Sequence, residues 1–289
     1  MTNHNQDTDN LFPIRDLSAR TQVNTVTLRA WERRYGLLTP QRTLKGHRLY
    51  SDHDVATIEK ILALVARGVP LGKVKPLLET DISAVSEGNG TENWQSSIAE
   101  LIAVIELFSV SKVENLIQRF FANYPAPICR ERLMEPVFAE LVQRDDNGAA
   151  LGFAESELVR YALTRLSAKV SKKKRSHAVT LIAGNQAPIW HLALMALELT
   201  DVKFSVYLLT GAFSVATGIE LAGKFKDAYT VFYQDGCWKV KEQELLAAAL
   251  LQNDRLLLCG TAPVLTRFDK EDRVFGDVNS CISGLLKLS

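Results

Sequence analysis

Apolar residues recur at helical spacing in four short segments of the first 80 residues. The periodicity predicts helices over residues 14–19, 25–35, 52–65 and 70–78, with Thr25 as the N-cap of the second helix and Gly36 at its end. Polar residues 22–24 predict a tight turn, so the first two helices form a helix-turn-helix. Extended residues flank Gly46 between positions 42 and 50, which predicts a β-hairpin beside these helices, a wing.

The pattern stays helical after a small, polar stretch at residues 81–92, which is typical of a linker. Four amphipathic stripes, over residues 94–108, 113–121, 133–142 and 158–170, predict a four-helix bundle. The basic run at residues 172–175 is interpreted as a solvated linker, although a phosphate-binding patch is the alternative.

The last third of the chain has a different pattern, with short continuous apolar runs alternating with helical segments. Strands are predicted over residues 178–184, 204–211, 229–233 and 256–260, and helices over 189–199, 215–225 and 242–251. This alternation is typical of a doubly wound, flavodoxin- or Rossmann-like domain with a parallel sheet. Asp235 and Gly236 add a hairpin pattern that predicts a short antiparallel ribbon at residues 231–240.

The predicted fold class is therefore mainly α plus α/β. A winged helix-turn-helix occupies residues 11–80, the linker residues 81–92, the central four-helix bundle residues 93–171, and the α/β domain residues 177–289.

Basic residues are concentrated in the winged segment, although the whole chain has a formal net charge of only +1. Between positions 13 and 48 there are eight basic residues against two acidic ones, a local excess of six positive charges. A helix that presents arginines fits the major groove of double-stranded DNA, and a basic hairpin fits the sugar-phosphate backbone. A merely solvated charged face is the alternative. The helix is expected to expose the candidate contacts Thr27, Arg29, Arg33 and Arg34, and the wing carries the candidates Arg42, Lys45, His47 and Arg48.

The run LRAWERRYGLL, followed by a P-x-R and by GHRLYS, resembles the DNA-binding domain of MerR-type transcriptional regulators, in particular the CarH/MlrA-like branch. The resemblance covers residues 12 to about 79. It implies DNA contacts at Arg29, Arg33, Arg42, His47 and Arg48. Tyr35 and Tyr50 occupy aromatic positions of the motif, and we include both among the DNA-binding residues, in a supporting role. It further implies a homodimer on near-palindromic promoter DNA, bending or untwisting of that DNA, and an indirect effect on RNA polymerase.

The bundle followed by an α/β domain also resembles the cobalamin-binding module of CarH-type regulators. There a Gly-(Asp/Glu)-x-His-x-x-Gly motif follows the first strand, and its His ligates cobalt. In this chain Ala187 stands at the His position and Trp190 at the second Gly, while His191 comes four residues late. The later Gly-Gly of that family corresponds to Gly260 and Thr261. We therefore expect the fold without cobalamin, with no cofactor and no metal.

A doubly wound sheet leaves a crevice at the carboxyl ends of its strands. Candidate residues for lining it are Gly184, Asn185, Gly211, Gly260 and Thr261. The crevice could take a small-molecule ligand, or the domain could serve only for self-association, and the sequence favours neither.

The four cysteines are scattered without a C-x-x-C pair, which indicates reduced, packed thiols. The polar N-terminus has no apolar segment of the kind found in signal peptides, and no apolar run is long enough to span a bilayer, so we expect a cytoplasmic protein without membrane contact. Motifs of nucleophilic or metal-dependent enzymes are lacking, so the chain is not expected to be an enzyme.

The resulting hypothesis is a sequence-specific, DNA-binding transcriptional regulator whose distal half senses a signal or assembles subunits. One alternative is a cobalamin-dependent regulator or carrier, sensing light or a ligand through a noncanonical cobalt ligand. Another is a nucleoid or recombination accessory factor that uses the same wing. A discrete promoter footprint would favour the first hypothesis, and broad coverage of DNA would favour the last.

Overall fold

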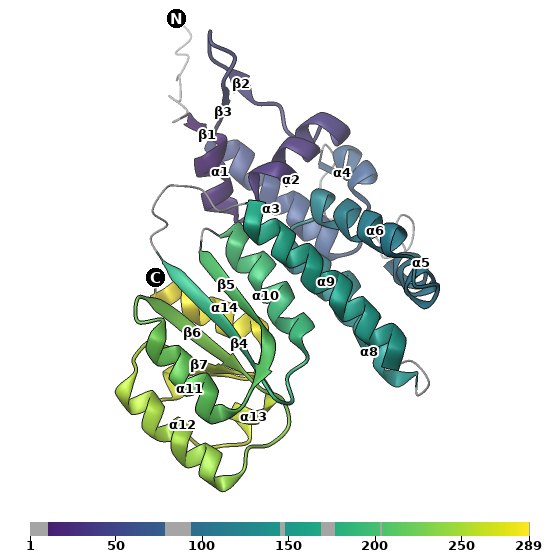
Figure 1. Ribbon diagram of the computed structural model, residues 1–289. Coiled ribbons are helices and arrows are strands. Elements are labelled where there is room, and N and C mark those ends of the chain that lie inside the picture. The colour runs from purple at the N-terminus through teal and green to yellow at the C-terminus, as the bar shows by residue number, and fades with distance from the viewer. Residues whose placement is uncertain (1–10, 79–93, 145–147, 169–176, 203, 289) are drawn as a thin grey trace, which may run out of the picture. The chain divides into compact units, whose positions relative to one another are not determined.

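The computed structural model describes residues 11–78, 94–144, 148–168, 177–202 and 204–288. The chain divides into two compact units, Met1–Ala150 and Leu151–Ser289, whose helices and strands are labelled in Figure 1. The predicted linkers at residues 81–92 and 172–175 lie outside the described residues.

The first unit begins with the predicted helix-turn-helix, formed by α1 (Ile14–Thr21) and α2 (Thr25–Ala30). Gln22 adopts a left-handed conformation (φ 57°) that ends α1. The side chain of Asn24 accepts hydrogen bonds from the backbone N–H groups of Val26 and Thr27, both at 2.9 Å. Asn24 is therefore the N-cap, one residue before the predicted one, because its short side chain reaches the free amides of the first turn.

The second helix continues as a π-helical turn, η1 (Trp31–Tyr35), and ends at Gly36 (φ 60°) as predicted. A three-stranded antiparallel sheet follows in the order β1 (Phe12–Pro13), β3 (Arg48–Tyr50), β2 (Gln41–Arg42). The predicted hairpin between β2 and β3 is confirmed. Gly46 turns the chain there with a φ of 79°, and its N–H donates to the carbonyl of Thr43 at 2.8 Å.

Helices α3 (Asp52–Ala66) and α4 (Leu71–Leu78) complete this part of the unit. Ser51 precedes α3, and its backbone N–H donates to the carboxylate of Asp54 at 2.8 Å. The large side chains buried at its centre come from all four predicted helices and from the wing: Leu17, Leu28, Trp31, Tyr50, Ile58, Ile61 and Leu71. Burial of this shared core fixes the helix-turn-helix and the wing relative to each other.

The remainder of the first unit is helical: α5 (Trp94–Glu106), α6 (Val110–Asn123), α7 (Ala126–Cys129), the π-helical turn η3 (Arg130–Met134) and α8 (Glu135–Gln143). Helix α5 packs against α6 and α8, and the rings of Trp94 and Tyr124 lie 5.1 Å apart. The fourth predicted amphipathic segment is α9 (Gly148–Ala168), most of which belongs to the second unit.

The second unit contains a parallel sheet in the order β5-β4-β6-β7-β8. Its strands are β4 (Ala178–Gly184), β5 (Ser205–Phe213), β6 (Ala228–Tyr233), β7 (Leu256–Cys259) and β8 (Val274–Phe275). The doubly wound class predicted from the alternating pattern is confirmed. Strand β8 was not predicted, because two residues give no periodic pattern.

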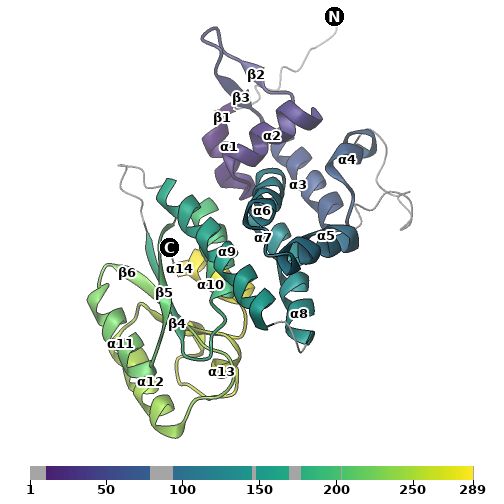
Figure 2. The ribbon, with the colours of Figure 1, turned by 45° about the vertical axis from the view of Figure 1, so that its right-hand side comes forward.

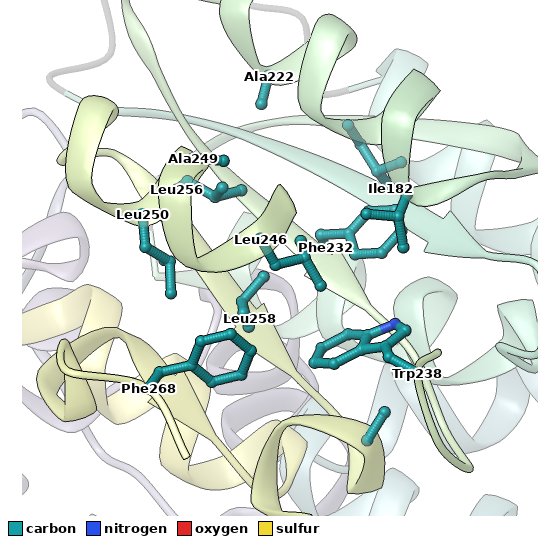
Figure 3. Close-up of a cluster of buried hydrophobic side chains, with 12 residues drawn as sticks. Ile182, Ala222, Phe232, Trp238, Leu246, Ala249, Leu250, Leu256, Leu258 and Phe268 are labelled. Carbon is teal, nitrogen blue, oxygen red and sulfur yellow. The ribbon is translucent and has the colours of Figure 1, made fainter. Parts of the chain in front are cut away.

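Helices α10 (Ile189–Asp201) and α14 (Val278–Leu288) pack together, as do α11 (Val215–Lys224) and α12 (Val240–Gln252). The two pairs cover opposite faces of the sheet (Figure 2). Between the sheet and the α11–α12 pair lies a buried apolar cluster that includes Ile182, Phe232, Trp238, Leu246 and Phe268 (Figure 3).

The prediction of an antiparallel ribbon at residues 231–240 is wrong. The structure describes this segment, and no strand follows Gly236 within it. Asp235 instead turns toward the short helix α13 (Thr261–Val264), where its Oδ1 accepts from the N–H and the hydroxyl of Thr261, both at 3.0 Å. Trp238 is buried in the apolar cluster. Hydrogen bonding and burial of this loop outweigh the local hairpin preference of Asp-Gly.

All four cysteines are free thiols, and three of them, Cys129, Cys259 and Cys281, are buried. Burial raises the pKa of the Cys281 thiol, which keeps it protonated. Among the helices that the structure describes, none has both the length and the apolar character needed to cross a membrane.

Candidate nucleic-acid interface

The recognition helix, α2 with η1, presents Arg29 and Arg33 to solvent four residues apart. Side chains at this spacing share one face of a helix. Within the part of the chain that the structure describes, neither guanidinium forms an ion pair or a hydrogen bond with another side chain. These two cations are therefore free to contact an anionic or base-edge partner.

Val26 extends the same face toward the start of the helix and is 53% exposed. Val26 was not identified as a candidate contact from the sequence, because a single valine beside an apolar stripe is normally interpreted as a core residue. Its position outside the Leu28–Trp31–Tyr35 stripe was the available clue. An exposed aliphatic group in the first turn of such a helix can contact the methyl group of thymine.

The exposure predicted for Thr27 is wrong, since its side chain is fully buried. The capping bond from its N–H to Asn24 fixes the first turn, and its hydroxyl faces the core without a hydrogen-bond partner in the described residues. Thr27 therefore supports the helix-turn-helix and does not face a partner.

Arg34 and Tyr35 contact helix α6, whereas Arg29 and Arg33 face solvent. The Nη1 atom of Arg34 donates to Oδ1 of Asn123 in α6 at 2.9 Å, and the hydroxyl of Tyr35 approaches the same oxygen at 3.4 Å. Their assignment as DNA contacts stays a prediction, and the geometry offers an intramolecular role for both.

The wing presents Lys45 and His47 at its tip, both exposed. Leu44 between the strands is also fully exposed. A hairpin tip that carries a cation and an imidazole can lie against phosphates without reading base sequence.

Arg42 and Arg48, at the base of the wing, are already paired with a carboxylate. Glu32 of η1 lies 2.5 Å from Nε of Arg48 and 3.3 Å from Nη2 of Arg42. The hydrogen bond that Arg48 donates to Glu32 raises the pKa of the Arg48 guanidinium. Glu32 thus ties the wing to the recognition helix and offsets part of the charge on both arginines.

Tyr50 is fully buried and pairs with Phe12 across the sheet, as its predicted supporting position requires. In this conformation its side chain is not available to DNA, because the hydroxyl lies inside the core with no hydrogen-bond partner in the described residues. Burial, assisted by the charge of Glu32, raises the pKa of Tyr50 to about 12.

Part of the crevice predicted in the second unit is occupied by Gln234, which is buried. The side chain of Gln234 lies over Gly184, where a Cβ would come within 1.8 Å of Gln234 Oε1. At Gly260 a Cβ would come within 2.3 Å of the Gln234 carbonyl oxygen. Gly184 ends β4, and Gly260 and Thr261 follow β7, so all three lie at the carboxyl ends of strands. There Gln234 packs against both glycines, and Asp235 accepts hydrogen bonds from Thr261.

The other two crevice candidates are placed differently. Asn185 is exposed beyond the end of β4. Gly211 lies inside β5, which runs two residues past its predicted end, at an irregularity in the pairing with β4. Gly211 is therefore not at the carboxyl edge where the prediction placed it.

Cobalamin does not fit the residues present. Ala187 offers no lone pair for cobalt, and the indole of Trp190 occupies the second glycine position of the motif. The ring of His191 is stacked on Trp190, with 3.5 Å between ring centroids, and on Tyr233 at 5.1 Å. No group of three or more His, Cys, Asp or Glu side chains among the described residues could hold a metal ion.

A hollow of about 340 Å³ lies near the opposite end of the sheet from this crevice. Residues from the ends of α11 and α12 line it, among them Ile219, Lys226, Gln252 and Asn253. It carries no convergent set of polar groups that would indicate a ligand class.

Comparison with known proteins bears on both units. Residues 12–81 match the family described as MerR HTH family regulatory protein. The HTH-type transcriptional regulator MlrA of Salmonella typhimurium is 32% identical over 176 residues, covering 61% of this chain and 70% of the relative. MlrA of Escherichia coli is 31% identical, with 60% and 69% covered. The HTH-type transcriptional repressor CarH of Myxococcus xanthus is 27% identical, with 65% and 66% covered.

Among solved structures, the monomethylamine corrinoid protein of Methanosarcina barkeri is 14% identical to this chain. The superposition has a TM-score of 0.47 and covers 68% of this chain and 99% of that chain. This similarity is too low to assign a function.

Proposed function

Because the chain belongs to the MerR family of helix-turn-helix transcriptional regulators, we propose that it binds promoter DNA through the recognition helix and the wing. The observation that carries this proposal is the pair Arg29 and Arg33, exposed and without ion pairs in the described chain, beside a wing whose tip carries Lys45 and His47. The helix reads base edges in the major groove, and the wing contacts the adjacent backbone.

The proposed DNA contacts of the helix and the wing differ in their chemistry. Arg33 and Arg29 can each pair with guanine through two parallel hydrogen bonds, and Val26 supplies an aliphatic contact. Lys45 and His47 supply contacts that are independent of sequence. Arg42 and Arg48 act mainly through Glu32, by holding the wing at the angle that lets its tip reach the backbone.

A homodimer on a near-palindromic site, with an indirect effect on RNA polymerase, completes the proposal. A two-fold pair of recognition helices reads two half-sites, and the DNA between them is deformed to fit. The second unit serves signal sensing or subunit assembly without cobalamin, for which the Gln234 side chain packed against Gly184 and the missing cobalt ligand at Ala187 are the support. A small-molecule ligand elsewhere on this unit is compatible with that role.

The test is quantitative DNA binding by the full chain. Binding to a fragment of its own promoter region and to random DNA of equal length is measured at several salt concentrations, with a footprint on the promoter fragment. We expect a discrete footprint, a large affinity ratio between the two DNAs, and a linear fall of log affinity with log salt.

Equal affinity for both DNAs with continuous coverage would reject regulation in favour of an architectural role. Salt-independent or undetectable binding by well-folded protein would reject DNA binding itself. Sedimentation of the complex, against the free chain, reports whether two copies assemble on one site.

A further inference from the structure

Three residues of the recognition helix converge on one residue of α6. Trp31, Arg34 and Tyr35 are spaced three and four positions apart, so they share a helix face that differs from the Arg29–Arg33 face. The indole Nε1 of Trp31 donates to the backbone carbonyl of Asn123 at 2.7 Å. Arg34 and Tyr35 reach its side-chain oxygen at 2.9 and 3.4 Å. We name this arrangement the Asn123 clasp.

The chemistry of the clasp is complementary. All three incoming groups can donate hydrogen bonds, and Asn123 presents two acceptor oxygens. Its amide nitrogen donates to the carbonyl of Arg119 at 2.8 Å, which fixes the orientation of the side-chain oxygen toward Arg34.

The position of Asn123 in the fold supplies the second acceptor. Asn123 is the last residue of α6, so its backbone carbonyl has no partner within the helix and is free to accept from Trp31. The carboxyl end of a helix also carries partial negative charge, which favours the nearby guanidinium of Arg34.

Burial makes this contact costly to break. Trp31 is fully buried and Asn123 is 8% exposed. A buried indole N–H left without a partner is costly, so separation of α6 from the recognition helix is disfavoured. The clasp therefore holds the recognition helix against the α5–α8 part of the first unit.

We infer that Asn123, which lies outside the segment matching the MerR family, is a positioning residue for DNA binding. It fixes η1 from one side, so that Arg29 and Arg33 on the other face are presented at a constant angle. Arg34 belongs to this clasp and not to the set of phosphate contacts. The inference rests on the proposed function, since its readout is DNA affinity.

The experiment is a double-mutant cycle in the full chain with Asn123→Ala, Arg34→Ala and the combined variant. Each single substitution is expected to lower affinity for the specific site roughly fivefold, because each removes about one hydrogen bond. The combined variant should lose little more than either single variant, because both remove the same interaction. The salt slope of Arg34→Ala should equal that of the wild type.

Matched controls separate positioning from general damage. Asn115→Ala removes an exposed Asn from the same helix and should bind as the wild type does. Asn123→Asp keeps an acceptor oxygen for Arg34 and should retain affinity where Asn123→Ala loses it. Circular dichroism and thermal unfolding establish that each variant is folded before binding is compared.

Several outcomes would overturn the assignment. Arg34→Ala reducing the salt slope by about 0.9 would place Arg34 on a phosphate. Additive losses, or unchanged affinity in Asn123→Ala, would remove the positioning role. Loss of salt-sensitive binding in the wild type would instead contradict the proposed function, so the two failures are distinguishable.

Discussion

Glu32 of the recognition helix and Arg48 of the wing form an ion pair, with 2.5 Å between Oε2 and Nε. The Glu32 side chain is 14% exposed, and its other oxygen serves Arg42. A single carboxylate therefore couples the element that would read bases to the element that would contact phosphates. It also places a negative charge inside an otherwise basic surface.

Glu32→Gln tests this coupling. Loss of the carboxylate leaves the wing less firmly held, while the surface becomes more positive. We expect stability of the first unit to fall by about 1 kcal/mol, given the partial exposure of both arginines. The ratio of specific to random DNA affinity should fall as well. Glu59→Gln, on the exposed side of α3, is the control; an unchanged ratio in Glu32→Gln would mean that the wing is held by packing alone.

Arg33→Ala should relax sequence choice. The guanidinium is exposed on the recognition helix and unpaired in the described chain, so its loss should cost about 1–3 kcal/mol on the specific site at the base that it reads. Binding to a panel of single-base variants of the site measures this. Equal losses on specific and random DNA would show that Arg33 contacts only the backbone.

Lys45→Ala should weaken binding to all sequences alike. Its ammonium lies at the exposed tip of the wing, so one phosphate contact is lost and the salt slope should decrease by about 0.9. Lys60→Ala, exposed on α3, is a charge-matched control. A change in preferred sequence without a change in slope would contradict the phosphate role.

Tyr50→Phe is expected to leave DNA affinity unchanged and to alter the alkaline stability of the protein. The buried hydroxyl has no partner in the described residues, so its removal should change stability at neutral pH by no more than about 1 kcal/mol. Burial raises the Tyr50 pKa to about 12 from 10.0, so the unfolded chain releases this proton first as pH rises.

The stability linked to this proton is therefore complete below pH 10.0 and is lost between pH 10.0 and about 12. Denaturant unfolding over this range, compared between the wild type and Tyr50→Phe, measures the difference. A variant whose alkaline loss equals that of the wild type would show that Tyr50 titrates normally, and reduced DNA affinity would show that its hydroxyl contacts DNA.

Cobalamin should not co-elute with the protein on gel filtration, and its addition should leave DNA affinity unchanged. Ala187→His alone should not restore binding, because Trp190 still stands at the second glycine position of the motif and the Gln234 side chain still packs against Gly184. Visible absorbance of the eluted protein is the readout. Stoichiometric colour in the wild type would show that a ligand other than residue 187 serves cobalt.

Much of the fold was predictable because its elements are locally encoded. The apolar stripe that includes Leu28 and Trp31 specifies the second helix, Gly36 marks its end, and the uninterrupted run from Ala178 to Gly184 forms a buried strand. The wrong predictions concern segments in which tertiary contacts overrode the local conformational preference. Asp235 and Gly236 favour a hairpin locally, but hydrogen bonds from Thr261 and burial of Trp238 decided the path of that loop.

The candidate interface shows the same division. The sequence by itself determined which residues are basic, which helix carries them, and that Ala187 cannot ligate cobalt, because these follow from residue type and periodicity. Only the tertiary structure decided that Thr27 and Tyr50 are buried, that Glu32 pairs with Arg42 and Arg48, and that Arg34 turns toward Asn123. The physical reason is that exposure and pairing depend on contacts between positions up to 92 residues apart, which no local pattern encodes.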